Sequence, residues 1–247
     1  MGLFNDYMRE GKGVDKGPDY RPRFVVFFDI YFRKFWNLIV LNILYVICCI
    51  PIVTIGPATA AMTKILRNYA REEHAFLWSD FWDTFKNNFW TAFVVGLIDL
   101  FAVILIYFDY VMYMQMIANA NGSQMVTSIS LAVLLLSATV LLFMNYYIFV
   151  LMVTFKLKFT QLIKNAFIFA WAGFFRNILI TLLIAIISFV CLITVLSMSP
   201  ASFFVVLFVL FLYFSTCGII SNFITYPLVK KYMIDGFDPE TGEKIEK

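Results

Sequence analysis

Asp99 is the ionisable residue least in keeping with its surroundings, because it lies near the middle of an apolar run from about Phe89 to Phe108. A carboxylate is costly in lipid and normally faces the interior of a helix bundle or a water-filled cavity. Gly96, Asp99 and Ala102 recur every three residues, so the acid shares one helix face with small side chains that would admit a neighbouring helix or a solute. Two interpretations stay open: a proton or solute site, or a protonated acid that joins two helices by a hydrogen bond.

Three amides in other apolar runs, Asn42, Asn145 and Asn222, are candidate partners of this acid. The single histidine, His74, lies in a polar turn, which excludes a His-rich metal site and a His-Glu-x-x-His metalloprotease motif. The sequence also contains no Gly-x-Ser-x-Gly motif and no glycine-rich phosphate loop after a strand. We therefore predict no enzymatic activity, no bound metal and no cofactor.

The elements that position Asp99 are predicted to be membrane helices. Of the 247 residues, 62% are hydrophobic and 14% are charged, whereas about a quarter of the residues in a soluble domain are charged. The basic residues are scattered among apolar runs and form no single stripe, which argues against nucleic-acid binding. We expect an all-α fold: a polytopic membrane helix bundle with about six membrane segments, the second one short, and amphipathic helices at the interface with the lipid bilayer.

Hydrophobic runs and turn residues give the order of these elements. Interfacial helices are expected at 24–34, 77–89 and 156–176, and the outer loops around 113–127 and at 199–200. The membrane segments are expected at about 35–50, 52–70, 89–108, 128–153, 177–197 and 202–226, the last ending before Pro227. The chain then divides into an N-terminal loop with an interfacial helix (1–34), the transmembrane bundle (35–234) and a polar tail (235–247).

The short second segment depends on a turn formed by Pro51, Gly56 and Pro57. Pro51 stops the first span, and Pro57, which has a fixed φ and no N–H, suits the first residue of a new helix. This helix would end in a basic turn at Lys64, Arg67 and Arg71. A full second span and a re-entrant hairpin place the following residues on the same side of the membrane, so the sequence leaves both open.

The distribution of Lys and Arg supports a chain that doubles back early. Seven of these residues lie in 1–34, four in 56–88, four in 154–176 and four in 227–247, with none in 109–127 or 197–202. Cytoplasmic loops hold the excess of Lys and Arg. A return through the short second segment therefore places every basic cluster, and both termini, in the cytoplasm.

Several motifs give the chain a resemblance to a known family. They are Met1-Gly2-Leu3-Phe4, Gly11-Lys12-Gly13-Val14, the Pro51–Pro57 turn with its following alanines, and the run Asp80–Phe89. With these motifs the chain resembles, over nearly its whole length, the YesL family of bacterial membrane proteins, which is classed as domain of unknown function 624. The resemblance implies a multi-pass protein of the bacterial plasma membrane, often encoded near carbohydrate uptake and sensing systems. It supplies no catalytic residues.

Two functions are expected from these observations. The first is a non-enzymatic membrane protein that assists or regulates carbohydrate uptake or sensing through helix contacts with a transport or sensor complex. The alternative is a small-solute transporter that uses Asp99. Six segments make a small pathway for one chain, so a homo-oligomer stays open as well.

Overall fold

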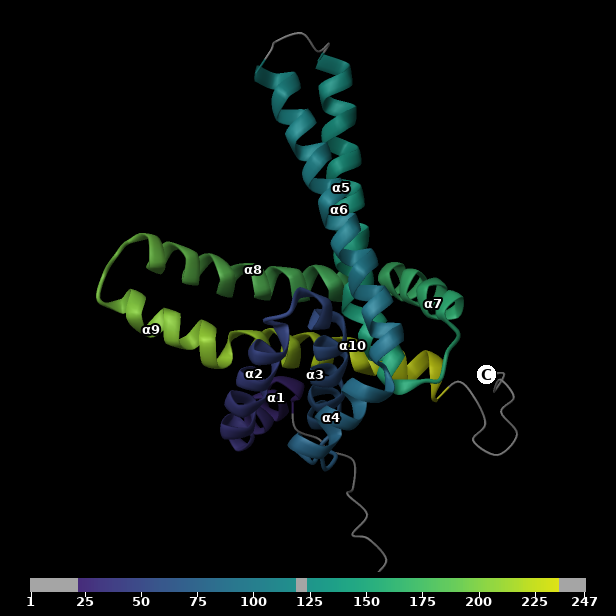
Figure 1. The fold of residues 1–247 in the computed structure, drawn as a ribbon, viewed down its shortest axis with the longest axis vertical. Coiled ribbons are helices and arrows are strands. Elements are labelled where there is room, and N and C mark those ends of the chain that lie inside the picture. Colours follow the sequence, from purple (N-terminus) through teal and green to yellow (C-terminus); the bar gives the residue numbers. More distant parts are fainter. Residues whose placement is uncertain (1–21, 119–123, 236–247) are drawn as a thin grey trace, which may run out of the picture.

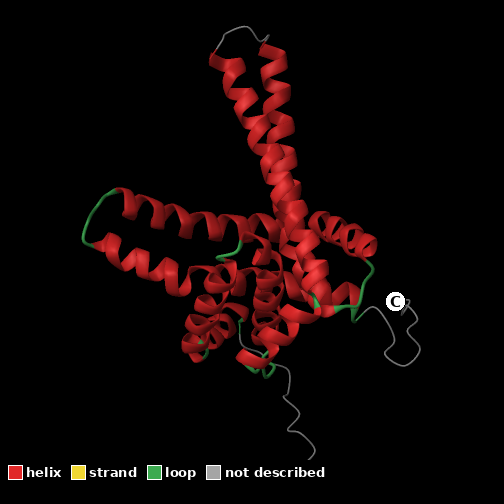
Figure 2. Cartoon of the chain, viewed as in Figure 1, coloured by secondary structure: helices red, strands yellow, loops and turns green. Residues whose placement is uncertain are grey.

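The computed structural model describes residues 22–118 and 124–235 of the chain. Every regular element in these two ranges is helical (Figure 2). The expected N-terminal loop up to residue 21, the centre of the first outer loop at 119–123 and the polar tail from residue 236 lie outside the described residues. The all-α prediction is therefore confirmed for the part of the chain that can be described.

The helices follow the predicted order. They are α1 (Arg23–Arg33), α2 (Phe35–Cys49), the 3-10 turn η1 (Ile52–Thr54), α3 (Ile55–Ala70), α4 (Leu77–Asn87), α5 (Phe89–Ala118), α6 (Gln124–Thr154), α7 (Phe159–Ala172), α8 (Phe174–Leu196), α9 (Ala201–Phe208), the π-helical turn η2 (Val209–Tyr213) and α10 (Phe214–Met233). The elements α9, η2 and α10 run on as one helix, and α1 meets α2 at a bend of 71°.

Among the described residues, the helices long and apolar enough to cross a membrane are α5, α6, α8 and the continuous helix Ala201–Met233. The pair α1–α2 would be a fifth only if its two helices, bent by 71°, count as one broken span. The chain is a multi-pass membrane protein. The first two predicted segments are α2, with 15 residues, and α3, with 16, which extend about 22 Å and about 24 Å, less than the roughly 30 Å of a hydrocarbon core. Neither reaches the length of a span by itself.

The short helix α3 forms the centre of the molecule. It contacts α2, α4, α5, α6 and α10, and twelve of its sixteen residues are buried. Its first half is rich in Gly and Ala, whose small side chains let neighbouring backbones come close. The predicted second membrane segment is therefore a helix enclosed by other helices of the same chain.

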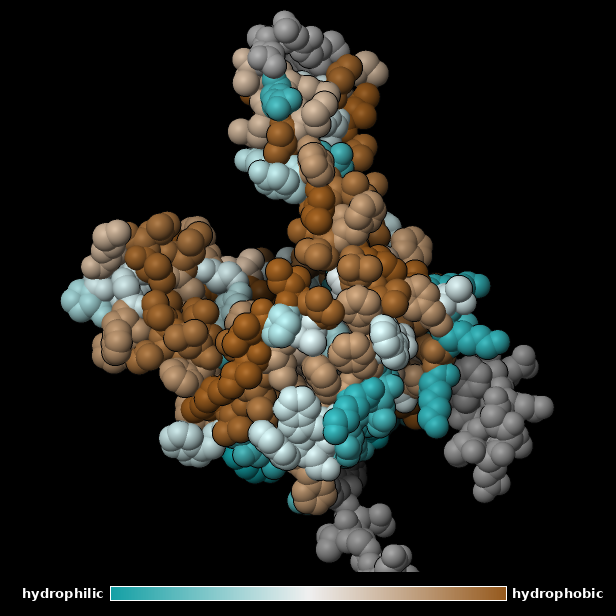
Figure 3. Space-filling view, in the orientation of Figure 1, coloured by the Kyte–Doolittle hydropathy of each residue, from teal (hydrophilic) through white to brown (hydrophobic). Residues whose placement is uncertain are grey.

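Two long helical hairpins project from this centre in different directions (Figure 1). One is formed by α5 and α6, the other by α8 with α9. Only 6% to 11% of the residues in the most apolar stretches of α5, α6 and α8 are buried. Apolar side chains cover much of the visible face of both hairpins, while hydrophilic ones gather at the base near α4 (Figure 3). The surfaces of both hairpins are therefore suited to contact with lipid.

Two predicted boundaries were wrong. The first outer loop is shorter than expected at 113–127, because α5 continues to Ala118 and α6 already begins at Gln124. Residues 113–118 contain neither Gly nor Pro, and nothing in them stops a helix before the turn residues begin.

The last helix was also expected to end before Pro227, but α10 continues through it to Met233. Proline in a helix leaves the carbonyl four residues earlier without its N–H partner. That carbonyl belongs to Phe223, and Arg23 of α1 donates a hydrogen bond from Nη2 to it at 3.2 Å. A side chain from another helix therefore supplies the missing donor, and the helix continues past the proline.

Candidate functional site

The site begins at the turn between α2 and α3, which is an irregular stretch between two short helices. Pro51 precedes η1, and the hydroxyl of Thr54 donates hydrogen bonds to the carbonyls of Cys48 (2.6 Å) and Pro51 (2.8 Å). These bonds satisfy the end of α2. Gly56 and Pro57 are buried in the first turn of α3, where the missing proline N–H leaves no intrahelical bond unmade.

The turn and the start of α3, residues 51–59, are called the hairpin tip below, and their backbone touches that of α5. A Cβ atom on Gly56 would lie 2.1 Å from the carbonyl oxygen of Ala92, and one on Gly96 would lie 3.1 Å from the Cα of Gly56. Only glycine at position 56 permits this approach, since real Cβ atoms do not come so near a backbone oxygen. The small residues on one face of α5 were expected to let a neighbouring helix come close, and that helix is α3.

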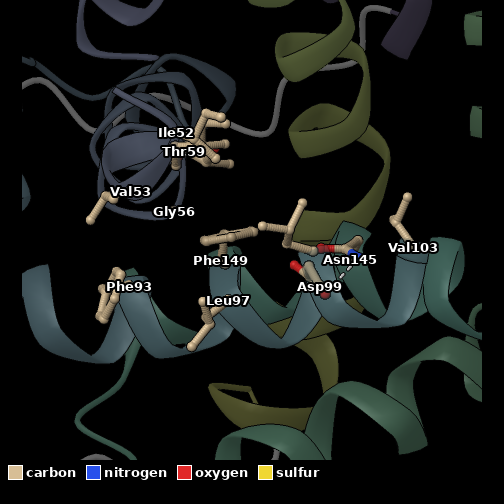
Figure 4. Close-up of a pocket in the computed structure, with 13 residues that line it drawn as sticks. Ile52, Val53, Gly56, Thr59, Phe93, Leu97, Asp99, Val103, Asn145 and Phe149 are labelled. Carbon is tan, nitrogen blue, oxygen red and sulfur yellow. Dashed lines mark hydrogen bonds between the residues drawn. The ribbon is translucent and has the colours of Figure 1, made fainter. Parts of the chain in front are cut away.

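Asp99 lies one helical turn beyond this contact and is paired with Asn145 of α6. The amide Nδ2 of Asn145 donates to Asp99 Oδ1 at 3.2 Å and to the Leu141 carbonyl at 3.3 Å (Figure 4). Asp99 Oδ2 and Asn145 Oδ1 accept no hydrogen bond from the described residues. The pair thus keeps two acceptor oxygens available for another molecule.

A partly open groove of about 440 Å³ runs beside this pair (Figure 4). The residues that line it come from the hairpin tip (Ile52, Val53, Ile55, Gly56, Thr59), from α5 (Phe93, Gly96, Leu97, Asp99, Leu100, Val103) and from α6 (Asn145, Phe149). Most of the lining is apolar, and the polar side chains are Asp99, Asn145 and Thr59. Small-molecule sites commonly have this volume and this mixture of an apolar wall with a few polar groups.

Asn42, the second predicted partner of Asp99, lies elsewhere and is fully buried against α10. Its Nδ2 donates to the Leu210 carbonyl at 2.8 Å, and its Oδ1 accepts the N–H of Ser215 at 2.9 Å. These two backbone groups are five residues apart, at the π-helical turn η2, where the normal helical bonding is interrupted. Asn42 therefore serves to bridge the widened turn.

Asn222 also lies outside the groove, on α10. Its Nδ2 donates to the Gly218 carbonyl in the same helix at 2.8 Å, while its buried Oδ1 accepts no bond among the described residues. Of the four predicted polar residues, the structure brings together Asp99 and Asn145 and separates both from Asn42 and Asn222. Intramembrane amides on different helices look alike in sequence, so only packing distinguishes them.

Among the described residues, the most deeply buried charge belongs to Arg67, which the sequence places in a basic turn. Arg67 is 4% exposed, and its Nη1 donates to the Val153 carbonyl and to the Thr154 hydroxyl, each at 2.9 Å. Its Nη2 donates to Asn68 Oδ1 at 2.9 Å. The guanidinium thus caps the end of α6, where free carbonyls and the helix dipole favour a cation. Nothing in the local sequence separates Arg67 from exposed Arg71.

Among the residues that the structure describes, no three His, Cys, Asp or Glu side chains come together as a metal site would require. The polar groups that the groove itself offers are one carboxylate, one amide and one hydroxyl in an apolar wall. Such a set can accept hydrogen bonds, bind a cation or carry a proton.

Residues 38–110 match the model of the protein family described as DUF624, a protein of unknown function. Over this range the chain is similar to the DUF624 family. The predicted resemblance to domain of unknown function 624 is confirmed over this range. The DUF624 segment starts inside α2 and ends inside α5, so it contains the hairpin tip, both glycines of the close contact and Asp99. Asn145 lies beyond it. No curated protein and no solved structure matches the chain.

Proposed function

We propose that this DUF624 protein is a non-enzymatic membrane transporter that binds a small, hydrogen-bond-donating solute or a cation in the groove at Asp99. The observation that carries the proposal is the Asp99–Asn145 pair, which faces an approximately 440 Å³ groove with two acceptor oxygens unused. A solute with hydroxyl or amine groups, or a proton, would complement these oxygens.

The interruption between α2 and α3 supports a role in solute binding. Secondary transporters commonly bind solutes near the membrane midplane, beside helices that break within the membrane. Irregular backbone at membrane depth is tolerated where protein buries it or where it lines a cavity. Here the irregular turn at 50–54 and the start of α3 form one wall of the groove. An acid that only joined two helices would need no such space beside it.

Two further statements belong to this proposal. The distribution of the basic clusters supports a cytoplasmic position for both termini. The resemblance to the YesL family argues for the bacterial plasma membrane and for a connection with carbohydrate uptake or sensing, which would make a hydroxylated solute a natural occupant of an acceptor-rich groove.

A second function, as an accessory to a transport or sensor complex, is favoured by one observation. The apolar stretches of α5, α6 and α8 are at most 11% buried within the chain, so both hairpins offer long surfaces to another membrane protein. Helix contacts of this kind, instead of solute binding, would then be the activity.

The test is flux through liposomes that contain the purified full-length protein. Proton influx is followed with a trapped pH-sensitive dye, and solute uptake with a set of labelled monosaccharides. The expected result is flux in the wild type, reduction to the level of protein-free liposomes in Asp99→Asn, and wild-type flux in Asp109→Asn. Asp109 is the matched control, because it is an exposed acid on the same helix and does not line the groove.

Each other outcome opposes transport through this groove. Flux that persists in Asp99→Asn, or that falls equally in Asp109→Asn, would remove Asp99 from the pathway. Absence of flux from the folded wild-type protein, together with a membrane partner that copurifies after mild crosslinking, would favour the accessory function.

A further inference from the structure

A second groove, of about 740 Å³, lies between α1, α8 and α10, away from Asp99. Its walls are aromatic and aliphatic. The charged residues that line it are Arg23 and Arg176, and no carboxylate does so in the described part of the chain. An apolar groove whose charge is only positive is complementary to a molecule that has an anionic group and a hydrocarbon part.

Arg176 lies at the end of this groove, in the first turn of α8. It forms no hydrogen bond or ion pair with any residue that the structure describes. Cations are favoured at helix C-termini, so the dipole of α8 does not stabilise it there. Because α8 is a candidate span, its first turn lies at the level of the lipid headgroups.

Arg23 is held close to Arg176 by α10. Its Nη2 donates to the Phe223 carbonyl at 3.2 Å, and its guanidinium lies 5.2 Å from the centre of the Phe223 ring. Both arginines line the same groove. Arg23 has further N–H donors in addition to the one that its structural bond uses. Together the two arginines form a positive site with unused N–H donors.

From this positive end the groove follows α8 and α10 towards the middle of the membrane. Leu179, Leu183 and Ile187 of α8 recur on one face beyond Arg176, opposite residues between Thr216 and Ile224 of α10. The distance from Arg176 to Ile187 along the helix is about 16 Å, which is close to half of a hydrocarbon core of roughly 30 Å. The apolar part therefore extends through about one leaflet.

We propose that this groove is a binding site for an anionic phospholipid, with the headgroup phosphate between Arg23 and Arg176 and one acyl chain along α8 and α10. Guanidinium groups match phosphate oxygens in charge and geometry. A zwitterionic headgroup is disfavoured, because its ammonium group would approach two guanidinium groups. This site shares no residue with the Asp99 groove, and either assignment can fail without the other.

The experiment measures lipid binding to the full-length protein in detergent micelles by native mass spectrometry. Phosphatidylglycerol and phosphatidylcholine are compared with the same acyl chains, and we expect phosphatidylglycerol to bind at least about tenfold more tightly. Inorganic phosphate and glycerol 3-phosphate serve as headgroups without chains. Neither should displace bound phosphatidylglycerol at millimolar concentration, because most of the groove is apolar. Displacement by either would identify a phosphate site in place of a lipid site.

Three variants test the location. Arg176→Gln should abolish the preference for phosphatidylglycerol while leaving the bond between Arg23 and Phe223 intact. Lys164→Gln removes the same charge from an exposed position on the neighbouring helix α7 and should leave the preference unchanged. Leu183→Trp should weaken binding of both lipids by filling the apolar groove. Equal effects of the Arg176 and Lys164 variants, or full binding by the folded Leu183 variant, would overturn the proposal.

Discussion

The helices around α3 and the two projecting hairpins are both rich in apolar residues, yet they are held in different ways. Around α3, backbones touch at Gly56 and buried polar side chains such as Asn42 and Arg67 bond across helices. Along the most apolar stretches of α5, α6 and α8, no more than 11% of the residues are buried. Lipid is as apolar as leucine, so hydrophobicity alone cannot gather helices in a membrane. The centre is therefore held by close approach and hydrogen bonds, whereas the hairpins are merely compatible with lipid.

This contrast predicts its largest effect at Gly56. In Gly56→Ala the new Cβ would meet the Ala92 carbonyl oxygen at 2.1 Å, so α3 and α5 must separate. We expect a loss of about 3 kcal/mol of stability or more, at the upper end for overpacked cores. The measurement is tryptophan-monitored unfolding of the purified protein in mixed micelles.

The neighbouring glycine provides the matched control. In Gly96→Ala the nearest atoms to the new Cβ are 3.1 Å and 3.2 Å away, so a small shift suffices and a loss of about 1 kcal/mol is expected. If both variants unfold at the same denaturant concentration, the backbone contact between α3 and α5 does not hold the centre together.

The next largest effect is expected at Arg67. Arg67→Met keeps much of the apolar stem but removes the cap from α6, and hydrogen bonds to a charged group contribute about 1.5–3 kcal/mol. Arg71→Met is the control: Arg71 pairs with Glu73 at 2.6 Å on a solvent-exposed side, where an ion pair contributes less than about 1 kcal/mol. The same unfolding assay compares them, and equal losses would place Arg67 in solvent.

These residues also show how far sequence reasoning reaches. The apolar runs, their order and the early return of the chain followed from hydrophobic pattern and turn residues, since these depend on neighbours along the chain. Asn145 was one of three amide partners that the sequence allowed for Asp99. Choosing among them requires the packing of α5 on α6, because Asn42 and Asn222 have equally apolar neighbours.

Two features could not be predicted because their cause lies in another helix. Arg67 is buried only because the end of α6, 86 residues later in the chain, supplies acceptors for its guanidinium. The helix continues through Pro227, and the Phe223 carbonyl that the proline leaves without a donor is bonded by Arg23, at the other end of the described chain. A local rule such as proline ending a helix fails where tertiary structure provides the missing partner.

The smallest effect is expected on the hairpins. Phe101 of α5 is 61% exposed, so its ring faces the micelle in both the folded and the unfolded protein. Phe101→Ala should then change the free energy of unfolding by less than about 0.5 kcal/mol, as for other exposed positions. Val95, in the same helix, is 1% exposed, and Val95→Ala removes less side chain but should destabilise by about 1 kcal/mol.

Which of the two variants loses more stability is a better test of the difference between the centre and the hairpins than either loss alone. The larger truncation, at Phe101, is predicted to have the smaller effect. If Phe101→Ala proves the more destabilising, its ring must be buried in solution by something outside the chain. Dilution in detergent would then identify what buries the ring. If the loss of stability in Phe101→Ala disappears as the protein is diluted, a second copy packs on the α5–α6 hairpin. A loss that persists at all concentrations indicates contacts within the chain, and the hairpin would belong with the centre.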